Sequence, residues 1–297
     1  MKYTMPNWNN IWKDMKSKNM QYYHSGEKDS IWESKEKARS FLKESRENPE
    51  RIHYVLEGLP INPGSRVIDI GAGPGTLAVP LAGMVYQVLA VEPAEGMAEV
   101  MEEYAIEEGV RNISILKERW EDINPAKDLN GDYDIVVASY SLGMPDIRAA
   151  IETMCEASSK WVYLFWFSGT SGWEEMMTYL WPKIHGKEYC HGPKADVLFN
   201  VLYSMGICPN VETKRTEYSR RFKNIQAAVN EYKGNFKIET KEQERILQDY
   251  LNSKLKENNG EFLFTQKTTR VKIWWNVNER EDTIVEDFNK TILPEVL

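Results

Sequence analysis

The stretch from residue 66 to residue 82 constrains the fold of this chain more than any other. An apolar run ending at Ile70 breaks into three alternating glycines, Gly71, Gly73 and Gly75, and apolar residues then recur at helical spacing as far as Ala82. This is the order of a strand, a tight turn and a helix, which opens a nucleotide-binding α/β unit. Glycine lets the backbone approach a ligand closely and take left-handed dihedral angles. The sequence therefore predicts a ligand-binding turn here.

The register of the turn narrows the choice of cofactor. A dinucleotide turn reads Gly-x-Gly-x-x-Gly, but here the third glycine comes one residue early and Asp69 stands two residues before the first. The pattern resembles motif I of the class I S-adenosylmethionine (SAM)-dependent methyltransferases, in particular small-molecule enzymes of the type 11 and type 12 kind. The resemblance implies that Asp69 lies near the ammonium group of the methionine moiety. It also implies that the turn lies under the methionine and ribose, through Gly71, Ala72, Gly73, Gly75 and Thr76.

The charge of Asp69 agrees with this resemblance. SAM carries a sulfonium and an ammonium group, which attract a carboxylate, whereas the pyrophosphate of a dinucleotide repels one. The sequence therefore favours SAM over NAD as the cofactor. A glycine-rich turn without a ligand is the alternative, and further motifs along the chain argue against it.

A second apolar strand, residues 87–91, ends in Glu92. Glu92 follows Asp69 by 23 positions, close to the spacing of about 20 expected for a carboxylate that binds ribose hydroxyls. Glu92 as a cap of the next helix is the alternative, and both roles can coexist. The family resemblance implies that Pro93 and Met97 then border the adenine.

A third strand, residues 113–116, leads into the loop that contacts adenine in the methyltransferase family. That family often has an acid followed by a small apolar residue there, whereas this chain has Arg119 and Trp120. Trp120 either stacks on the adenine or belongs to the core, because aromatic residues bury well anywhere. Glu121 or a backbone amide is expected to bond the adenine amino group.

A fourth strand begins at Tyr133 and resembles the family's motif IV, with Ser139 and Tyr140 at its carboxyl end. Ligands of open α/β sheets bind at the carboxyl ends of strands, so these residues should face the methyl group. The Asp/Asn-Pro-Pro-aromatic motif of many amino-methyltransferases is absent here. Tyr140, His185 and His191 are the candidates for a catalytic base, and a structural or surface role is the alternative for each.

The predicted fold class is α/β: a Rossmann-like class I methyltransferase fold with a seven-stranded, mostly parallel sheet and helices on both faces. Four segments are expected. They are a helical cap (1–60), a SAM-binding core (61–168), the completion of the core with helical insertions that cover the substrate (169–276) and an acidic tail (277–297) that forms a peripheral helix. The remaining strands are predicted at 161–167, 210–218 and 262–275, with inserted helices between 224 and 257.

The N-terminal helices are candidates for a lid over the active site, as is common in SAM enzymes that act on small molecules. Their aromatic residues are the candidates for contact with the substrate: Trp8, Trp12, Tyr22 and Tyr23. Packing on the domain surface is the alternative for each. The sequence Ser30-Ile31-Trp32-Glu33 has the form of a capping box and predicts a helix start.

Charge and composition exclude several partners. A net charge of −8 and an isoelectric point near 5.3 argue against a standing role on nucleic acid or an anionic membrane. No membrane span or signal peptide is predicted. Three scattered cysteines predict reduced thiols and a cytoplasmic location. Cys190 and His191 beside His185 invite a metal interpretation, but their spacing fits no tetrahedral zinc template, so no metal is predicted.

These motifs predict an enzyme that transfers a methyl group from SAM to a small molecule by in-line displacement. A general base is required only if the acceptor atom is protonated. A methyltransferase acting on protein or RNA is the first alternative, since it shares the cofactor half. A non-catalytic SAM-binding regulator is the second. The sequence names no acceptor atom and no oligomeric state.

Overall fold

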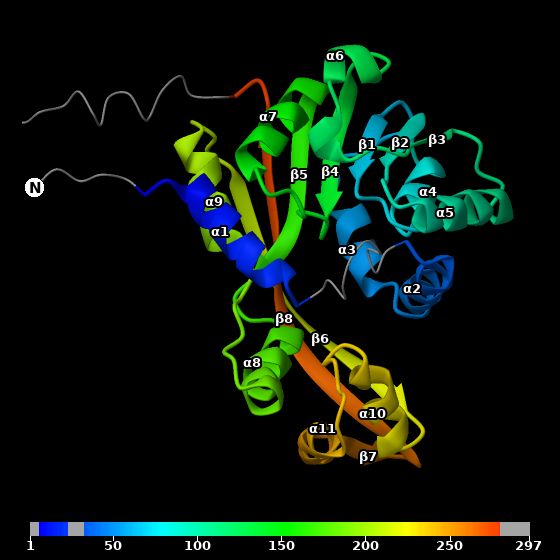
Figure 1. Cartoon of the computed structure of the whole chain (residues 1–297). Helices are drawn as coiled ribbons and strands as arrows, with labels where there is room; N and C mark the ends of the chain where they lie inside the picture. The colour runs from blue at the N-terminus through cyan, green and yellow to red at the C-terminus, as the bar shows by residue number, and fades with distance from the viewer. Residues whose placement is uncertain (1–5, 23–32, 280–297) are drawn as a thin grey trace, which may run out of the picture.

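The computed structural model describes residues 6–22 and 33–279, and Figure 1 shows their arrangement. The described strands are β1 (Arg66–Ile70), β2 (Gln87–Val91), β3 (Ile113–Leu116), β4 (Tyr133–Ser139), β5 (Ser158–Ser168), β6 (Asn210–Phe222), β7 (Lys256–Asn258) and β8 (Glu261–Asn276). The described helices are α1 (Trp8–Met20), α2 (Lys35–Glu47), α3 (Glu50–Glu57), α4 (Ala78–Ala82), α5 (Glu95–Glu107), the 3-10 turn η1 (Trp120–Asp122), α6 (Pro125–Asp128), α7 (Ile147–Ala157), α8 (Gly172–His185), α9 (Ala195–Ser204), α10 (Ile225–Lys233) and α11 (Lys241–Lys254).

The strands form one mixed sheet in the order β3-β2-β1-β4-β5-β8-β6, with β7 paired to β8. Strands β1 to β5 run parallel, and β8 is antiparallel to both of its neighbours β5 and β6. The predicted fold class is confirmed, with the short β7 as an eighth strand in the described residues. The central strands are buried on both faces, as the near-continuous apolar runs of a parallel sheet require.

Two apolar cores cover the two faces of the sheet. Alternate residues of each strand point to opposite faces, so Ile68 and Val136 join one core while Val67 and Val137 join the other. Helices α1, α7 and α9 pack together on the first face, and α2 packs on α5 over the second. This arrangement leaves the carboxyl ends of the parallel strands at one edge, where the glycine turn follows β1.

The last strands are longer than predicted. β6 continues four residues beyond the expected end at residue 218, because it pairs with β8 along its whole length, as far as Phe222 opposite Phe262. The resulting ribbon extends away from the parallel strands, and α8, α10 and α11 lie along it (Figure 1). These helices and the ends of the ribbon share a third apolar core, which includes Leu180, Phe236 and Leu251. The predicted insertion between residues 224 and 257 therefore forms α10 and α11. We call these two helices, together with α8 and the β6–β8 ribbon, the arm.

The N-terminal helices differ from expectation in one boundary. Ser30 lies outside the described residues, and α2 begins at Lys35 with Ser34 as its N-cap, whose side chain accepts a hydrogen bond from the Lys37 amide. The predicted tail helix also falls mostly outside the described residues, which end at residue 279. Within residues 6–22 and 33–279, no helix combines the length and the apolar character that a membrane crossing requires.

Candidate active site

The glycine turn after β1 leaves room for the close approach of a ligand at one of its three glycines. Gly71, Gly73 and Gly75 have φ angles of 65°, 58° and 81°, which side chains other than glycine adopt only with strain. A Cβ on Gly71 would lie 2.5 Å from Ser141 Cβ, and one on Gly75 would lie 2.6 Å from Met101 Cγ. A Cβ on Gly73 would meet no described atom within 4 Å. Gly71 and Gly75 are therefore needed for packing, whereas Gly73 leaves open space for a ligand.

Glu92 connects the end of β2 to this turn. Its carboxylate accepts hydrogen bonds from the amides of Gly73 at 2.8 Å and Ala94 at 2.9 Å, one on each oxygen. Each carboxylate oxygen has a second lone pair, so both can still accept a hydroxyl proton. Glu92 is 7% exposed, and burial raises its pKa. Glu92 thus bonds to the amide of the N-cap residue Ala94 and does not cap the first turn of α5, and its free lone pairs are compatible with the predicted contact with ribose.

Asp69 is a buried carboxylate in need of a cation. It is 2% exposed, and among the described residues its Oδ2 has no hydrogen-bond partner. Burial and the negative charge of Glu92 together raise the pKa of Asp69 to about 8, against the opposing effects of Arg51 and of a hydrogen bond from the Ala78 amide. An unpaired buried carboxylate is costly unless a partner neutralises it. The ammonium group of a methionine moiety would be such a partner.

Arg51 also lies beside this site, and the sequence did not point to it. It belongs to α3, and the hydrogen bond of its side chain to a described residue is a 3.5 Å contact with Ser45. Its guanidinium lies 5.7 Å from the centre of the Tyr140 ring. Burial and the neighbouring Arg270 lower the pKa of Arg51, while Asp69 raises it. A lone arginine among the apolar residues of a helix carries no local signal that it faces a site formed by β1 and β4.

Tyr140 stands at the carboxyl end of β4, beside two arginines. Its φ angle is 60°, and the Arg270 and Arg51 guanidinium groups lie 5.3 Å and 5.7 Å from its ring centre. Among the described residues, the hydroxyl oxygens of Tyr140 and of the neighbouring Ser139 are buried without hydrogen-bond partners. Burial raises the pKa of Tyr140 against the opposing effect of the arginines. Tyr140 is therefore a phenol at neutral pH and can donate a hydrogen bond.

Comparison with known proteins agrees with this geometry. Residues 67–159 match a family model described as a methyltransferase domain. Residues 67–159 therefore form a class I SAM-dependent methyltransferase domain. An uncharacterized protein of Haemophilus influenzae is 27% identical to this methyltransferase over 232 residues, which are 75% of this chain and 81% of that protein. The solved structure of a putative methyltransferase from Bacillus halodurans has the same fold, with a TM-score of 0.53 and 13% identity over 76% of this chain and 98% of its own.

Shorter matches show that the domain is shared between acceptor classes. A ubiquinone biosynthesis O-methyltransferase of Rickettsia canadensis is 30% identical over 94 residues, which are 30% of this chain and 38% of that protein. Ribosomal RNA methyltransferases match over similarly short stretches. The methyltransferase uses SAM, and the residues around the turn fit that cofactor: a buried acid for the ammonium group, a carboxylate with spare lone pairs for the ribose, and open space over Gly73.

The adenine-side residues are divided between core and surface. Trp120 is 3% exposed, and its Nε1 donates a 3.0 Å hydrogen bond to the Ala150 carbonyl, so it is held in the core against α7. Met97 is also buried, whereas Pro93 is exposed after β2. Arg119 and Glu121 are exposed and form an ion pair of 2.9 Å. The indole of Trp120 therefore lies in the core, which is the second of the two roles expected for it.

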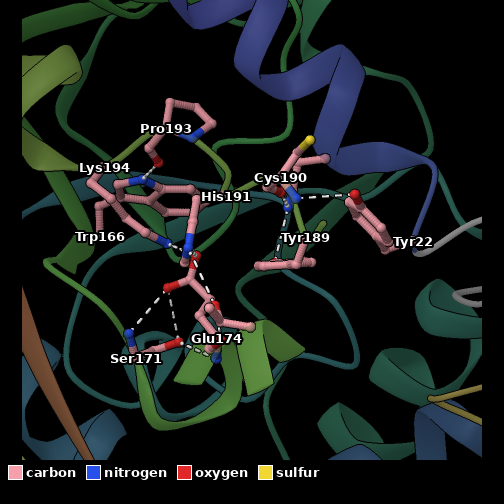
Figure 2. A network of polar contacts seen from close by, with 11 residues as sticks. Tyr22, Trp166, Ser171, Glu174, Tyr189, Cys190, His191, Pro193 and Lys194 are labelled. Carbon is pink, nitrogen blue, oxygen red and sulfur yellow. Dashed lines mark hydrogen bonds and ion pairs between the residues drawn. The ribbon is translucent and has the colours of Figure 1, made fainter. Parts of the chain in front are cut away.

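The two histidine candidates are not brought to the glycine turn. His185 lies on the arm, where its Nε2 is 2.9 Å from the Phe236 carbonyl oxygen and its ring centre lies 4.2 Å from that of Trp181, with the two rings tilted by 40°. His191 lies beside Glu174, 3.6 Å from its carboxylate, in a network that also includes Lys194 and Ser171 (Figure 2). Of the three predicted catalytic candidates, only Tyr140 stands beside the cofactor residues. No group of histidine, cysteine and acidic side chains with metal-binding geometry occurs within the described part of the chain.

The predicted lid residues anchor α1. Trp12 is fully buried, and its Nε1 donates to the Met144 carbonyl at 2.9 Å. Tyr22 is buried in the third core, where its hydroxyl donates to the Glu188 carbonyl at 3.1 Å and accepts from the Cys190 amide at 3.0 Å. Trp8 packs against the first core, and Tyr23 lies outside the described residues.

Two surface hollows lie away from Gly73. The larger, of about 500 Å³, separates α2 from α5 and is lined by paired charges such as Arg39 with Glu103 and Arg46 with Glu107. The smaller, of about 280 Å³, reaches Thr76 from the outer side of the turn. The charged side chains that line these hollows are already paired. We therefore place the cofactor at Asp69, which has an unpaired carboxylate oxygen, and at the open face of Gly73.

Proposed function

We propose that the methyltransferase acts on a small molecule, by in-line displacement at the methyl carbon. The observation that carries this proposal is the cover over the end of β5. Trp166 Nε1 donates to the Pro193 carbonyl at 2.9 Å, and Asn19 of α1 donates to the Cys190 carbonyl at 2.7 Å. Helix α1 and the segment before α9 are thereby tied together over the strand end where the acceptor must bind. Such a cover favours a small acceptor over a macromolecule.

The residues of the site divide the task of holding and orienting the reactants. SAM supplies a methyl group on a sulfonium, which is already a good leaving group. Asp69 takes the ammonium group, Glu92 the ribose and the glycine turn the methionine backbone, while Tyr140 donates a hydrogen bond at the methyl-facing end of β4. Orientation and exclusion of water then supply most of the rate.

An RNA acceptor has less support. The matches to ribosomal RNA methyltransferases cover 22–28% of this chain, so they carry no information about the remainder. The strand β6 is rich in basic residues, which include Lys214, Arg215, Arg220 and Arg221, but part of this charge is neutralised: Arg220 pairs with Glu44 and Glu231, and Arg221 lies near Glu261. A net charge of −8 opposes the electrostatic attraction that dominates binding to RNA.

A labelling experiment tests the acceptor class. The full chain is incubated with methyl-tritiated SAM and, separately, with the low-mass metabolites, the total RNA and the proteins of the source cells. We expect label in the low-mass fraction alone, and none with the Glu92→Ala variant, which lacks the ribose carboxylate. Label in RNA or protein at comparable yield would contradict the proposal.

We further propose that Arg51 binds the carboxylate of the methionine moiety. Arg51→Gln is expected to weaken binding of S-adenosylhomocysteine (SAH) by about tenfold or more, because a charged hydrogen bond between buried groups is lost. Isothermal titration calorimetry of the full chain measures this. Arg221→Gln is the matched control, since Arg221 is an exposed arginine of β6 far along the ribbon. Equal affinities of the two variants would exclude Arg51 from the cofactor site.

A further inference from the structure

Three cations from three different elements meet aromatic rings at the ends of β4 and β5. Lys16 Nζ of α1 lies 5.8 Å from the Trp166 ring, Lys194 Nζ lies 5.6 Å from the Phe167 ring, and the Arg270 guanidinium of β8 lies 5.3 Å from the Tyr140 ring. We call Lys16, Lys194 and Arg270 the acceptor-side cations. The rings themselves are in contact, with Phe167 5.1 Å from Tyr140 and 5.4 Å from Trp166.

Of these three cations, one has an acidic partner among the described residues. Lys194 pairs with Glu174, which also faces His191 and Ser171 (Figure 2). Within residues 6–22 and 33–279, neither Lys16 nor Arg270 has an ion-pair partner, and Arg270 Nε is buried without a hydrogen-bond partner. Burial, and to a lesser extent the charge of Lys194, lowers the pKa of Lys16 to about 8.

The buried Nε of Arg270 has no hydrogen-bond partner among the described residues, which is costly unless a ligand supplies an acceptor and a counter-charge. The proposed function assigns the single carboxylate of the cofactor to Arg51, so it leaves Arg270 without an anion. The rings provide apolar and quadrupolar surface beside the cations, a combination that suits a planar anion.

We propose that the methyl acceptor is an anionic small molecule, with a carboxylate or phosphate group bound by Arg270 beside the rings of Tyr140 and Phe167. Lys16 and Lys194 add to the positive potential around the same rings. Carboxylate and phosphate share the planar or forked oxygen geometry that a guanidinium binds through two hydrogen bonds. This inference rests on the proposed function, because it concerns the acceptor of the same site.

Binding of three probes to the SAH-saturated full chain tests the proposal. Benzoate and phenyl phosphate carry the two candidate anions on a ring, and benzamide is their neutral match. We expect at least one anion to bind at least about tenfold more tightly than benzamide in calorimetry. Arg270→Gln should weaken that anion by about tenfold and leave the SAH affinity within about twofold. Lys16→Met should give a smaller loss, and Arg221→Gln none.

Each other outcome has a defined meaning. Equal binding of benzamide and the anions, no binding of either anion, or unchanged anion affinity in Arg270→Gln would overturn the proposal. A loss of SAH affinity in Arg270→Gln equal to the loss for the anion would assign Arg270 to the cofactor and also overturn it. Arg270→Lys keeps the charge but not the paired hydrogen bonds, so it should lose less anion affinity than Arg270→Gln and more than Arg221→Gln, which covers the case that Arg270→Gln folds poorly. Failure of the wild-type chain to bind SAH would contradict the proposed function instead, and anion binding without SAH would still be measurable.

Discussion

Gly73→Ala is expected to weaken SAH binding by at least about tenfold while leaving the chain folded. A Cβ at this position meets no described atom within 4 Å, so the protein itself accommodates the added methyl group. The φ angle of 58° adds strain, about 1 kcal/mol for an alanine. The methyl group would nevertheless occupy the space over the turn where the cofactor lies. Calorimetry with SAH and a thermal melt of the ligand-free chain measure the two effects separately.

Gly75→Ala is the matched control, because its added methyl group overlaps atoms of the protein itself rather than the space for the cofactor. Its Cβ would lie 2.6 Å from Met101 Cγ and 2.9 Å from Val79 Cγ2, at a φ of 81°. We expect a loss of about 3 kcal/mol in the free energy of unfolding from overpacking and backbone strain together. If Gly73→Ala retained its SAH affinity, or if Gly75→Ala melted like the wild type, the assignment of the open and packed sides of the turn would be wrong.

Asp69→Asn is expected to weaken SAH binding by at least about tenfold and, at the same time, to stabilise the ligand-free chain by about 1 to 3 kcal/mol at pH 8. In the folded protein the pKa of Asp69 is raised from 3.8 to about 8. Between these values the folded state binds more protons than the unfolded state, so the free energy of unfolding falls as pH rises through this window. The asparagine variant cannot ionise and lacks this fall.

Urea unfolding at pH 5, 7 and 9 measures the difference between Asp69→Asn and the wild type. The stability gap should widen from pH 5 to pH 9 in favour of the variant. Saturating SAH should reduce the pH dependence of the wild type, because the ligand's ammonium group stabilises the ionised carboxylate. A gap that does not change with pH would show that Asp69 has an ordinary pKa, and the affinity loss would then need another cause.

The cofactor half could be predicted because its signals are local. The spacing of Asp69, the glycines and Glu92 lies within two strand-turn units, and β3 begins and ends where its apolar run predicts. The fold class followed from the number and order of such units. The same reasoning could not decide between stacking and burial for Trp120, since an indole suits both, and the hydrogen bond to Ala150 depends on how α7 packs.

The arginines around Tyr140 could not be predicted because they meet only in the folded chain. Arg51 precedes the glycine turn and Arg270 lies in the last described strand, yet both face the ring of Tyr140. Nothing in the neighbours of either arginine distinguishes it from a surface residue. The histidines illustrate the opposite error: His185 lies in a segment expected to cover the site, but the third core directs that segment toward α10 and α11.

That third core has a consequence for local stability. The first two cores share the central sheet, whereas the core formed by α8, α10 and α11 joins the rest through the β6–β8 ribbon and through Tyr22, which follows α1. A unit attached in this way can open at a lower free energy than global unfolding. We therefore expect amide hydrogens to exchange faster in α10 and α11 than in the parallel strands that carry the glycine turn.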